Sequence, residues 1–317
     1  MSKRVKYLII YLAVMLSLTL VRIMANEGLL GSSNTAIDNI FTILTQIVCM
    51  GMIPILSMFF VEKEDGAKLL KDRLYLTKPR LKGAWGWIVL IAILHPIVNG
   101  GISTVWYGLL RAIGYTPIVG DSEIIQGVGG FIVALILGSV LPGVFEEVTH
   151  RGLVLGFTSG SVHKRAFTSA LLFALMHQNI AQTGYTFVGG LIMAYLVLYT
   201  GSIFPSMLVH FVNNALVDIR TFSSSHGGIV SKAFDFIFSN MDKWWFVLIL
   251  TIIWAAAVVG VYFIIVRLKK KSEASGVELG SVVEDSSDTK LSKILLVAIV
   301  VFGALTTLYS LIWGLLR

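Results

Sequence analysis

The feature that most constrains this chain is a repeated apolar stretch long enough to cross a lipid bilayer. A transmembrane helix needs about 20 mainly apolar residues. Such stretches lie at about residues 6–25, 40–61, 85–110, 127–149, 166–181, 184–200, 203–219, 244–266 and 294–316. Lipid cannot satisfy free backbone polar groups, so spanning segments of this kind fold as helices. We therefore predict an all-α fold, a polytopic transmembrane helix bundle with about eight to nine spans.

Composition supports a membrane protein and excludes several other classes. The chain of 317 residues is 56% hydrophobic and 14% charged, whereas about 25% of residues are charged in an average soluble domain. The net charge of +7 does not indicate a nucleic-acid partner, because the basic residues lie beside the apolar stretches. The single cysteine, Cys49, lies inside such a stretch, which excludes a disulfide framework and a Cys-based metal site.

The distribution of basic residues predicts how the helices cross the membrane. Basic residues gather in residues 1–6, in the loop 62–84, in the link after the fourth stretch, and in residues 267–271. Nine crossings with a cytosolic N-terminus would place all of them on the cytosolic side, where Lys and Arg are enriched. Residues 26–39, by contrast, contain no Lys or Arg. We expect a multi-pass protein of the cell membrane, specifically the bacterial cytoplasmic membrane.

The first apolar stretch has a second interpretation as a cleaved signal peptide, because a basic segment precedes it. Its apolar part is long, however, and Arg22 follows without a clear small-residue cleavage site. We therefore favour a retained first span.

The chain divides into five parts by composition. These are N-terminal spans 1–126 with the basic cytosolic loop 62–84, core spans 127–219, an eighth span with its flanks 220–271, a linker 272–292, and a C-terminal span 293–317. The linker is polar, acidic and Ser-rich, which predicts a flexible cytosolic tether. No internal repeat indicates a transporter built from duplicated halves.

Two adjacent carboxylates occur in "FEEVTHRG" at residues 145–152, close to the end of the fourth stretch. Residues four apart share a helix face, so Glu147 and Arg151 can form an ion pair in the favoured orientation. Glu146 is turned about 100° away and shares its face with His150. We expect a structural Glu147 and a chemically active Glu146. The alternative is that both carboxylates are interfacial charges that reach cytosolic water.

Two further stretches carry polar residues at helical spacing. Phe173 and His177 are four apart in "FALMH", and His210 and Asn214 are four apart in "LVHFVNN". Each alone is compatible with an ordinary hydrogen bond between membrane helices. Together with Glu146 they place ionisable or polar groups in three spans, which indicates a shared, hydrated functional site.

This set of residues suits hydrolysis. A Glu beside an imidazole can deprotonate a water, and a second imidazole and an amide can donate hydrogen bonds to an oxyanion. Glu146, His177 and His210 are also potential ligands of a divalent metal such as zinc, so the residues leave open a metal-bound or a metal-free water. The chain has no HExxH zinc-protease motif and no Gly-x-Ser-x-Gly nucleophile elbow.

The three motifs also resemble a known family. "EEVTHR", "FALMH" and "HFVNN" match Glu-Glu-x-x-x-Arg, Phe-x-x-x-His and His-x-x-x-Asn in order. They are similar to the CAAX-protease and bacteriocin-processing (CPBP, or ABI) family of intramembrane glutamate or metallo-endopeptidases. The resemblance covers about residues 127–218. His150 departs from it, because the family often has a bulky aromatic residue there.

The resemblance implies a helical core with a catalytic cavity open toward the cytosol. It implies that Glu146 is the general base, assisted by His177. His210 and Asn214 would stabilise the oxyanion. Glu147 and Arg151 would form a supporting ion pair, and Phe173 would pack beneath the site. His150 would alter the acidity of Glu146 or substrate fit, or be a passive polar residue at the interface.

Three functions remain open at this stage. The first is an intramembrane endopeptidase acting on a membrane-associated peptide or protein. The second is a non-catalytic regulatory or scaffold protein of the same family, whose loop 62–84 and linker 272–292 contact a partner membrane protein. The third is a transporter that uses Glu146 and the histidines as a proton relay, which the lack of a repeat disfavours.

Overall fold

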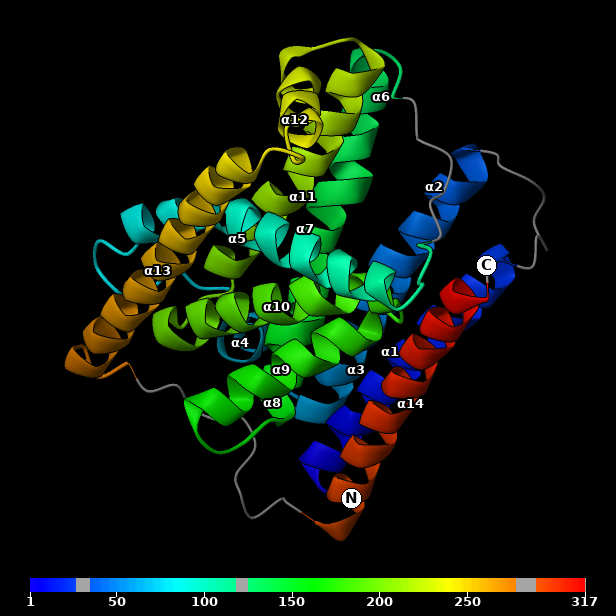
Figure 1. The fold of residues 1–317 in the computed structure, drawn as a ribbon. Coiled ribbons are helices and arrows are strands. Elements are labelled where there is room, and N and C mark those ends of the chain that lie inside the picture. Colours follow the sequence, from blue (N-terminus) through cyan, green and yellow to red (C-terminus); the bar gives the residue numbers. More distant parts are fainter. Residues whose placement is uncertain (27–34, 118–124, 278–288, 317) are drawn as a thin grey trace.

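The computed structural model describes residues 1–26, 35–117, 125–277 and 289–316. Every regular element in these ranges is a helix, and the ranges contain no strand (Figure 1). The predicted all-α fold is therefore confirmed.

Seven helical segments among the described residues are long and apolar enough to cross a membrane. They are Lys3–Met24, Asn39–Glu62, Trp85–Ala112, Gly127–Phe157, Ile180–Thr200, Trp244–Ala274 and Lys290–Leu315. The two other predicted stretches form α9 (Val162–Met176), which has only 15 residues, and α11 (Phe204–Ser225), which carries many polar side chains. A further helix, α12 (Ile229–Ser239), was not predicted.

Two spans depart from regular α-helix where they approach the centre of the molecule. The second span consists of α2 (Thr35–Ile43), π-helical η1 (Leu44–Met52) and α3 (Ile53–Glu62). The fourth consists of α6 (Gly127–Ala134), η3 (Leu135–Val140), α7 (Leu141–Glu147), η4 (Val148–Val154) and α8 (Leu155–Phe157). A proline opens α3 and α7 and lacks the backbone donor of a regular turn. Such wide turns often accompany functional sites.

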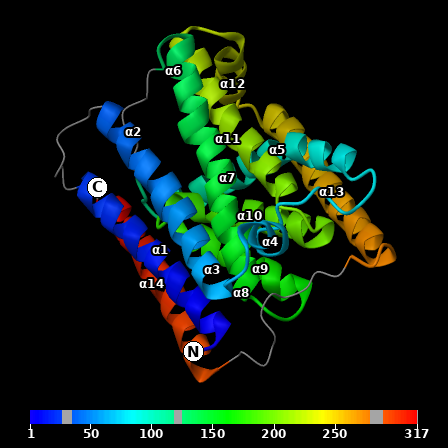
Figure 2. The same ribbon diagram turned by 180° about the vertical axis from the view of Figure 1, so that it is seen from behind.

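The bundle is organised around α10 (Ile180–Thr200), which packs against α9, α11, α5 (Trp85–Ala112) and α13 (Trp244–Ala274). Helices α1 (Lys3–Asn26) and α14 (Lys290–Leu315) lie side by side along one edge, and α13 lies along the opposite edge (Figures 1 and 2). Helices α1 and α14 run in the same direction, as the first and ninth crossings of the predicted topology would.

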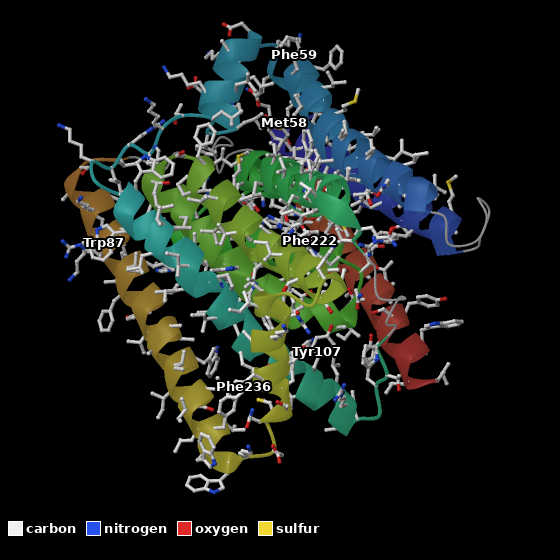
Figure 3. All side chains as sticks on the ribbon, turned by 90° about the horizontal axis from the view of Figure 1, so that it is seen from above. Met58, Phe59, Trp87, Tyr107, Phe222 and Phe236 are labelled. Carbon is white, nitrogen blue, oxygen red and sulfur yellow. The ribbon has the colours of Figure 1, made fainter. Side chains whose placement is uncertain are left out.

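Helix α13, at the edge of the bundle, is joined to α5 by a cation–π contact. Trp87, at the start of α5, lies toward α13 (Figure 3), and the guanidinium of Arg267 sits 5.0 Å from the centre of its ring. A positive group over an indole face is stabilising, so this contact joins α5 to α13 near one end of the bundle.

The predicted linker 272–292 falls mostly outside the described residues, because 278–288 are not described. Its ends are helical, since α13 extends through Ala274 and α14 begins at Lys290. The hydroxyl of Thr289 accepts a hydrogen bond from the backbone N–H of Ser292. This N-terminal cap explains why α14 starts inside the predicted linker.

We predict that Gly190→Val destabilises the protein. A β-carbon at Gly190 would lie 3.1 Å from Cα of Ala170 on α9, and overpacking of this kind costs about 1–3 kcal/mol. Thermal unfolding in detergent measures the effect. Gly100→Val is the matched control, because a β-carbon at this helical glycine meets nothing within 4 Å. Equal unfolding temperatures for the two variants would contradict the close packing of α9 on α10.

Candidate active site

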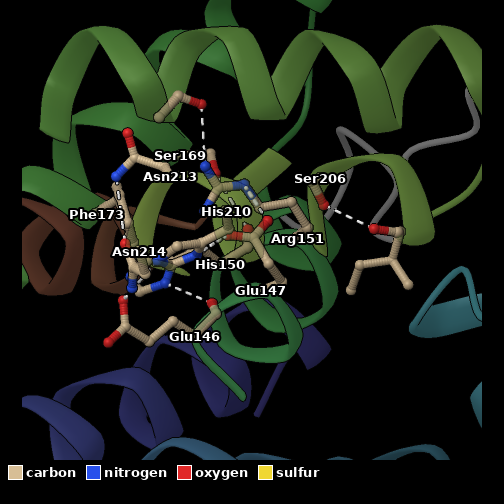
Figure 4. Close-up of polar contacts among 12 residues, drawn as sticks. Glu146, Glu147, His150, Arg151, Ser169, Phe173, Ser206, His210, Asn213 and Asn214 are labelled. Carbon is tan, nitrogen blue, oxygen red and sulfur yellow. Dashed lines mark hydrogen bonds and ion pairs between the residues drawn. The ribbon is translucent and has the colours of Figure 1, made fainter. Parts of the chain in front are cut away.

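A buried ion pair lies at the centre of the site. Arg151 Nε is 3.2 Å from Glu147 Oε2, and both side chains are fully buried. Glu147 Oε1 is 3.0 Å from Nδ1 of His210 on α11. Arg151 also donates to the backbone carbonyl of Gly190 at 3.1 Å. These contacts, drawn in Figure 4, join the end of the fourth span to α10 and α11.

The carboxylate of Glu147 determines which nitrogen of His210 carries a proton. A carboxylate accepts hydrogen bonds and does not donate them, so the Nδ1–H of His210 donates to Glu147. The other ring nitrogen, Nε2, is 3.9 Å from Glu146 Oε2. This separation is too long for a hydrogen bond, but a water molecule can bridge such a gap.

The two oxygens of Glu146 have different surroundings. Oε1 accepts a hydrogen bond from Nε2 of Gln46, in η1, at 2.8 Å. Oε2 is buried and has no hydrogen-bond partner among the described residues. The side chain is therefore held by one oxygen while the other is free to accept a proton.

His177 lies at the end of α9 and faces the same region. Its Nδ1 donates to the carbonyl of Phe173 at 2.7 Å, so the neutral ring has an unprotonated Nε2. Glu146 and His210 are both near enough to interact with His177 electrostatically. His177 is partly exposed, so it is more accessible than Glu146 or His210.

Phe173 is the apolar centre around which the polar groups are arranged. Its ring centre lies 4.9 Å from the ring of His177 and 5.8 Å from the ring of His210, both edge-to-face. The guanidinium of Arg151 sits 4.8 Å from the same ring. One side chain thus contacts three members of the site.

Asn214 is held by a chain of amides that begins on another helix. Asn99 on α5 donates to Oδ1 of Asn213 at 3.1 Å, and Asn213 donates to Oδ1 of Asn214 at 3.3 Å. Asn214 Nδ2 donates to the carbonyl of Gly138 at 3.1 Å. An amide nitrogen has two hydrogens, so one donor of Asn214 remains for a ligand.

His150 and the two carboxylates are not at a wet interface, contrary to one of the alternatives stated above. His150 is fully buried, with Nδ1 bonded to the backbone carbonyl of Glu146 at 2.8 Å and Nε2 3.2 Å from the hydroxyl of Tyr11. Glu147 is fully buried, and Glu146 is 8% exposed. Helix α1 covers this side of the fourth span, which the linear sequence does not reveal.

The sequence motifs do not include four polar residues near the site, namely Tyr11, Gln46, His95 and Asn99. They also do not indicate the hydrogen bond from Asn99 to Asn213. The available signal was the same one used elsewhere, a polar side chain inside an apolar stretch. His95 and Asn99 even repeat the His-x-x-x-Asn spacing. His95 is buried against Gly189 of α10, and the side chain of Asn99 approaches the same glycine.

The residues considered as metal ligands were Glu146, His177 and His210. Among the described residues, no group of three or more His, Cys, Asp or Glu side chains is arranged to hold a metal ion. Glu146 Oε2 and His210 Nε2 approach one another, but the third donor does not join them. The donor geometry of the described residues does not fit a three-ligand zinc site.

The fold and the site define a class, a polytopic helical membrane protein with a buried acid–imidazole site. The sequence model of the family described as "Rce1-like: Type II CAAX prenyl endopeptidase Rce1-like" matches residues 128–216. This match confirms the resemblance to the CPBP family and supports CAAX-type intramembrane protease activity in general. It covers under a third of the chain. Comparisons with curated proteins and with solved structures gave no match.

The matched segment contains the three motifs but not every residue of the site. Glu146, His177, His210 and Asn214 lie inside residues 128–216. Gln46, which holds Glu146, lies outside it and comes from an earlier span.

We predict that Glu147→Gln destabilises the protein by about 3–5 kcal/mol, because it leaves the charge of Arg151 buried without its partner. Chemical or thermal unfolding in detergent measures this effect. The double variant Glu147→Gln/Arg151→Met should lose less than the sum of the single variants, since the pair is coupled.

The control is Glu273→Gln, which removes a loose pair with Lys269 on α13 at 3.9 Å. Its effect should stay below about 1 kcal/mol, as for other exposed pairs. Additive effects of Glu147→Gln and Arg151→Met would contradict the coupling.

Proposed function

We propose that this protein is an intramembrane endopeptidase of the CAAX-protease type. It would hydrolyse a peptide bond of a membrane-associated peptide or protein, in the bacterial cytoplasmic membrane. The observation that carries the proposal is the free oxygen of Glu146. It is buried, unpaired among the described residues, and 3.9 Å from His210 Nε2, within the segment that matches the family.

In the proposed reaction Glu146 Oε2 takes a proton from water. The water oxygen forms a bond to the peptide carbonyl carbon, and the carbonyl oxygen becomes an oxyanion. When this intermediate collapses, the C–N bond breaks and Glu146 returns the proton to the departing amine nitrogen. General base and acid catalysis of this kind contributes about 100- to 10,000-fold.

The two histidines would have different tasks because their hydrogen bonds differ. His177 has its proton on Nδ1, so its Nε2 accepts a hydrogen bond from the attacking water and orients it. His210 donates Nδ1–H to Glu147, and this bond orients the ring so that Nε2 lies toward Glu146. In the form of His210 that has bound a second proton from solvent before the reaction, Nε2–H would donate to the oxyanion and keep that proton throughout.

Asn214 would supply a second hydrogen bond to the oxyanion. One amide hydrogen is used on the carbonyl of Gly138, and the carbonyl oxygen of the side chain accepts from Asn213. These bonds orient the NH2 group, so the remaining hydrogen points away from both partners. Phe173 supports the pair by contacting His177 and His210.

A second candidate function is a non-catalytic membrane protein that regulates a partner. The burial of the site favours it, because Glu146 is 8% and His210 7% exposed, whereas a protease must admit its substrate. In that case the buried polar groups would serve stability and helix specificity alone. The loop 62–84 and the region 272–292 would then provide the contact surfaces.

We predict that Glu146→Gln abolishes peptide hydrolysis, because the amide cannot accept the proton. Purified protein in liposomes, offered membrane-derived peptides in water enriched in heavy oxygen, should release products that carry one heavy oxygen atom at the new carboxyl terminus. Rates should fall about 100- to 10,000-fold. His177→Ala and His210→Ala should also lower the rate.

Glu273→Gln on α13 makes the same chemical change far from the site and should retain full activity. Unfolding temperatures should show that Glu146→Gln remains folded. If the wild type and Glu146→Gln release the same products at the same rate, the endopeptidase proposal is wrong. A phenotype in cells that survives all three site substitutions would support the regulatory function.

We predict that hydrolysis survives treatment with a zinc chelator within about twofold, because the described residues offer no three-donor group of the kind that structural and catalytic zinc sites use. Initial rates before and after chelation and dialysis measure this. Loss of activity that added zinc restores would show instead that Glu146, His177 and His210 close around a metal.

A further inference from the structure

The turn between α9 and α10, residues 177–179, carries His177 and is attached to three helices outside the family-matched segment. Inside the matched segment the turn connects the end of α9 to the start of α10. Its additional hydrogen bonds come from α1, α5 and α14. These contacts attach both ends of the turn to the rest of the bundle.

Helix α1 binds the first two residues of the turn. The guanidinium of Arg22 donates to the backbone carbonyl of His177. Nε2 of Gln178 donates to Oγ1 of Thr19 at 2.7 Å. Thr19 and Arg22 are three apart and therefore share one face of the helix. The carbonyl of His177 is one of the last in α9, and such carbonyls lack a partner in their own helix.

Helices α5 and α14 bind the other end of the turn. The indole N–H of Trp106 donates to the carbonyl of Ile180 at 2.7 Å. The N–H of Ile180 donates to Oγ of Ser310 on α14 at 2.8 Å. The first amides of a helix have no partner within it, so Ser310 satisfies one that α10 cannot. Asn179 caps a second amide, that of Ala181, at 3.0 Å.

The backbone of the turn needs this support. Gln178 has φ of +49°, in the left-handed region that costs a non-glycine residue about 1–3 kcal/mol. Just before the turn, α14 approaches α9 closely, since a β-carbon at Gly303 would lie 2.8 Å from Cβ of Leu175. The conformation is therefore maintained by contacts from other helices rather than by local preference.

We propose that Thr19, Arg22 and Ser310 are positioning residues, which hold His177 in register with Glu146. This inference rests on the proposed function, because it assigns His177 to the activated water. Arg22 acts on the turn through its bond to the carbonyl of His177 itself. The N-terminal and C-terminal spans would thus complete a site whose motifs all lie in the middle of the chain.

The test combines kinetics with a structural readout that needs no substrate. Thr19→Val and Ser310→Ala remove the oxygens that accept from the turn. Both should lower kcat by about 10- to 100-fold, since a displacement of about 1 Å can cost 100-fold, while KM changes less than about threefold. Hydrogen–deuterium exchange of residues 175–182 should become faster in both variants.

Conservative variants separate positioning from general stability. Thr19→Ser keeps the oxygen and should restore kcat to within about twofold of the wild type. Thr306→Val is the matched control on α14, because the hydroxyl of Thr306 bonds only to carbonyls of its own helix. It should leave both kcat and the exchange of residues 175–182 unchanged. Arg22→Leu should resemble Thr19→Val.

The possible failures are distinguishable. In a wild type that cleaves peptides, an unchanged kcat in Thr19→Val and Ser310→Ala would overturn the positioning role alone. Unchanged exchange of residues 175–182 would show that these contacts do not hold the turn, and would also overturn it. A wild type that cleaves nothing would overturn the proposed function, and the assignment of His177 with it.

Discussion

The structure depends on the placement of one carboxylate, Glu147, with no exposure to solvent. A buried charge is tolerated only when its partners satisfy it, and Glu147 has two, Arg151 and His210. Because His210 comes from α11, and Arg151 also bonds to α10 through Gly190, the ion pair fixes three segments relative to one another. The cost of leaving any of these groups unpaired in a low-dielectric interior makes the arrangement specific.

The adjacent carboxylate, Glu146, has a different environment, although the two residues are consecutive in the chain. The helical turn directs Glu146 away from Arg151 and toward Gln46, which bonds to one oxygen and leaves the other without a partner. Two identical side chains thus have different partners: Glu147 lies 3.2 Å from Arg151 and 3.0 Å from His210, whereas Glu146 Oε2 comes no closer than 3.9 Å to His210. The ring of Phe173 contacts the imidazoles of both His177 and His210, so one apolar side chain supports the two polar rings of the site.

The site is assembled from more of the chain than its motifs indicate. Residues 128–216 contain the motifs and match the family. The side chain of Glu146, however, is oriented by a hydrogen bond from Gln46 in η1, which lies outside that segment. Asn214 is oriented through Asn99 of α5, and the turn at His177 is attached to α1 and α14. A fragment restricted to the matched segment would lack each of these supports.

The sequence by itself determined the helical class, the positions of nine apolar segments and the pairing of Glu147 with Arg151. These properties follow from hydropathy and from the four-residue periodicity of a helix, which are local. Only the tertiary structure decided that His210 bonds to Glu147, that His150 lies buried against Tyr11, and that Gln46 and Asn99 belong to the site. Such contacts join residues from about 60 to 140 positions apart, and no local pattern specifies which faces of distant helices will meet. The start of α14 inside the predicted linker has a different cause, because Thr289 caps the helix through the amide of Ser292 only three residues on, a local signal within a polar stretch.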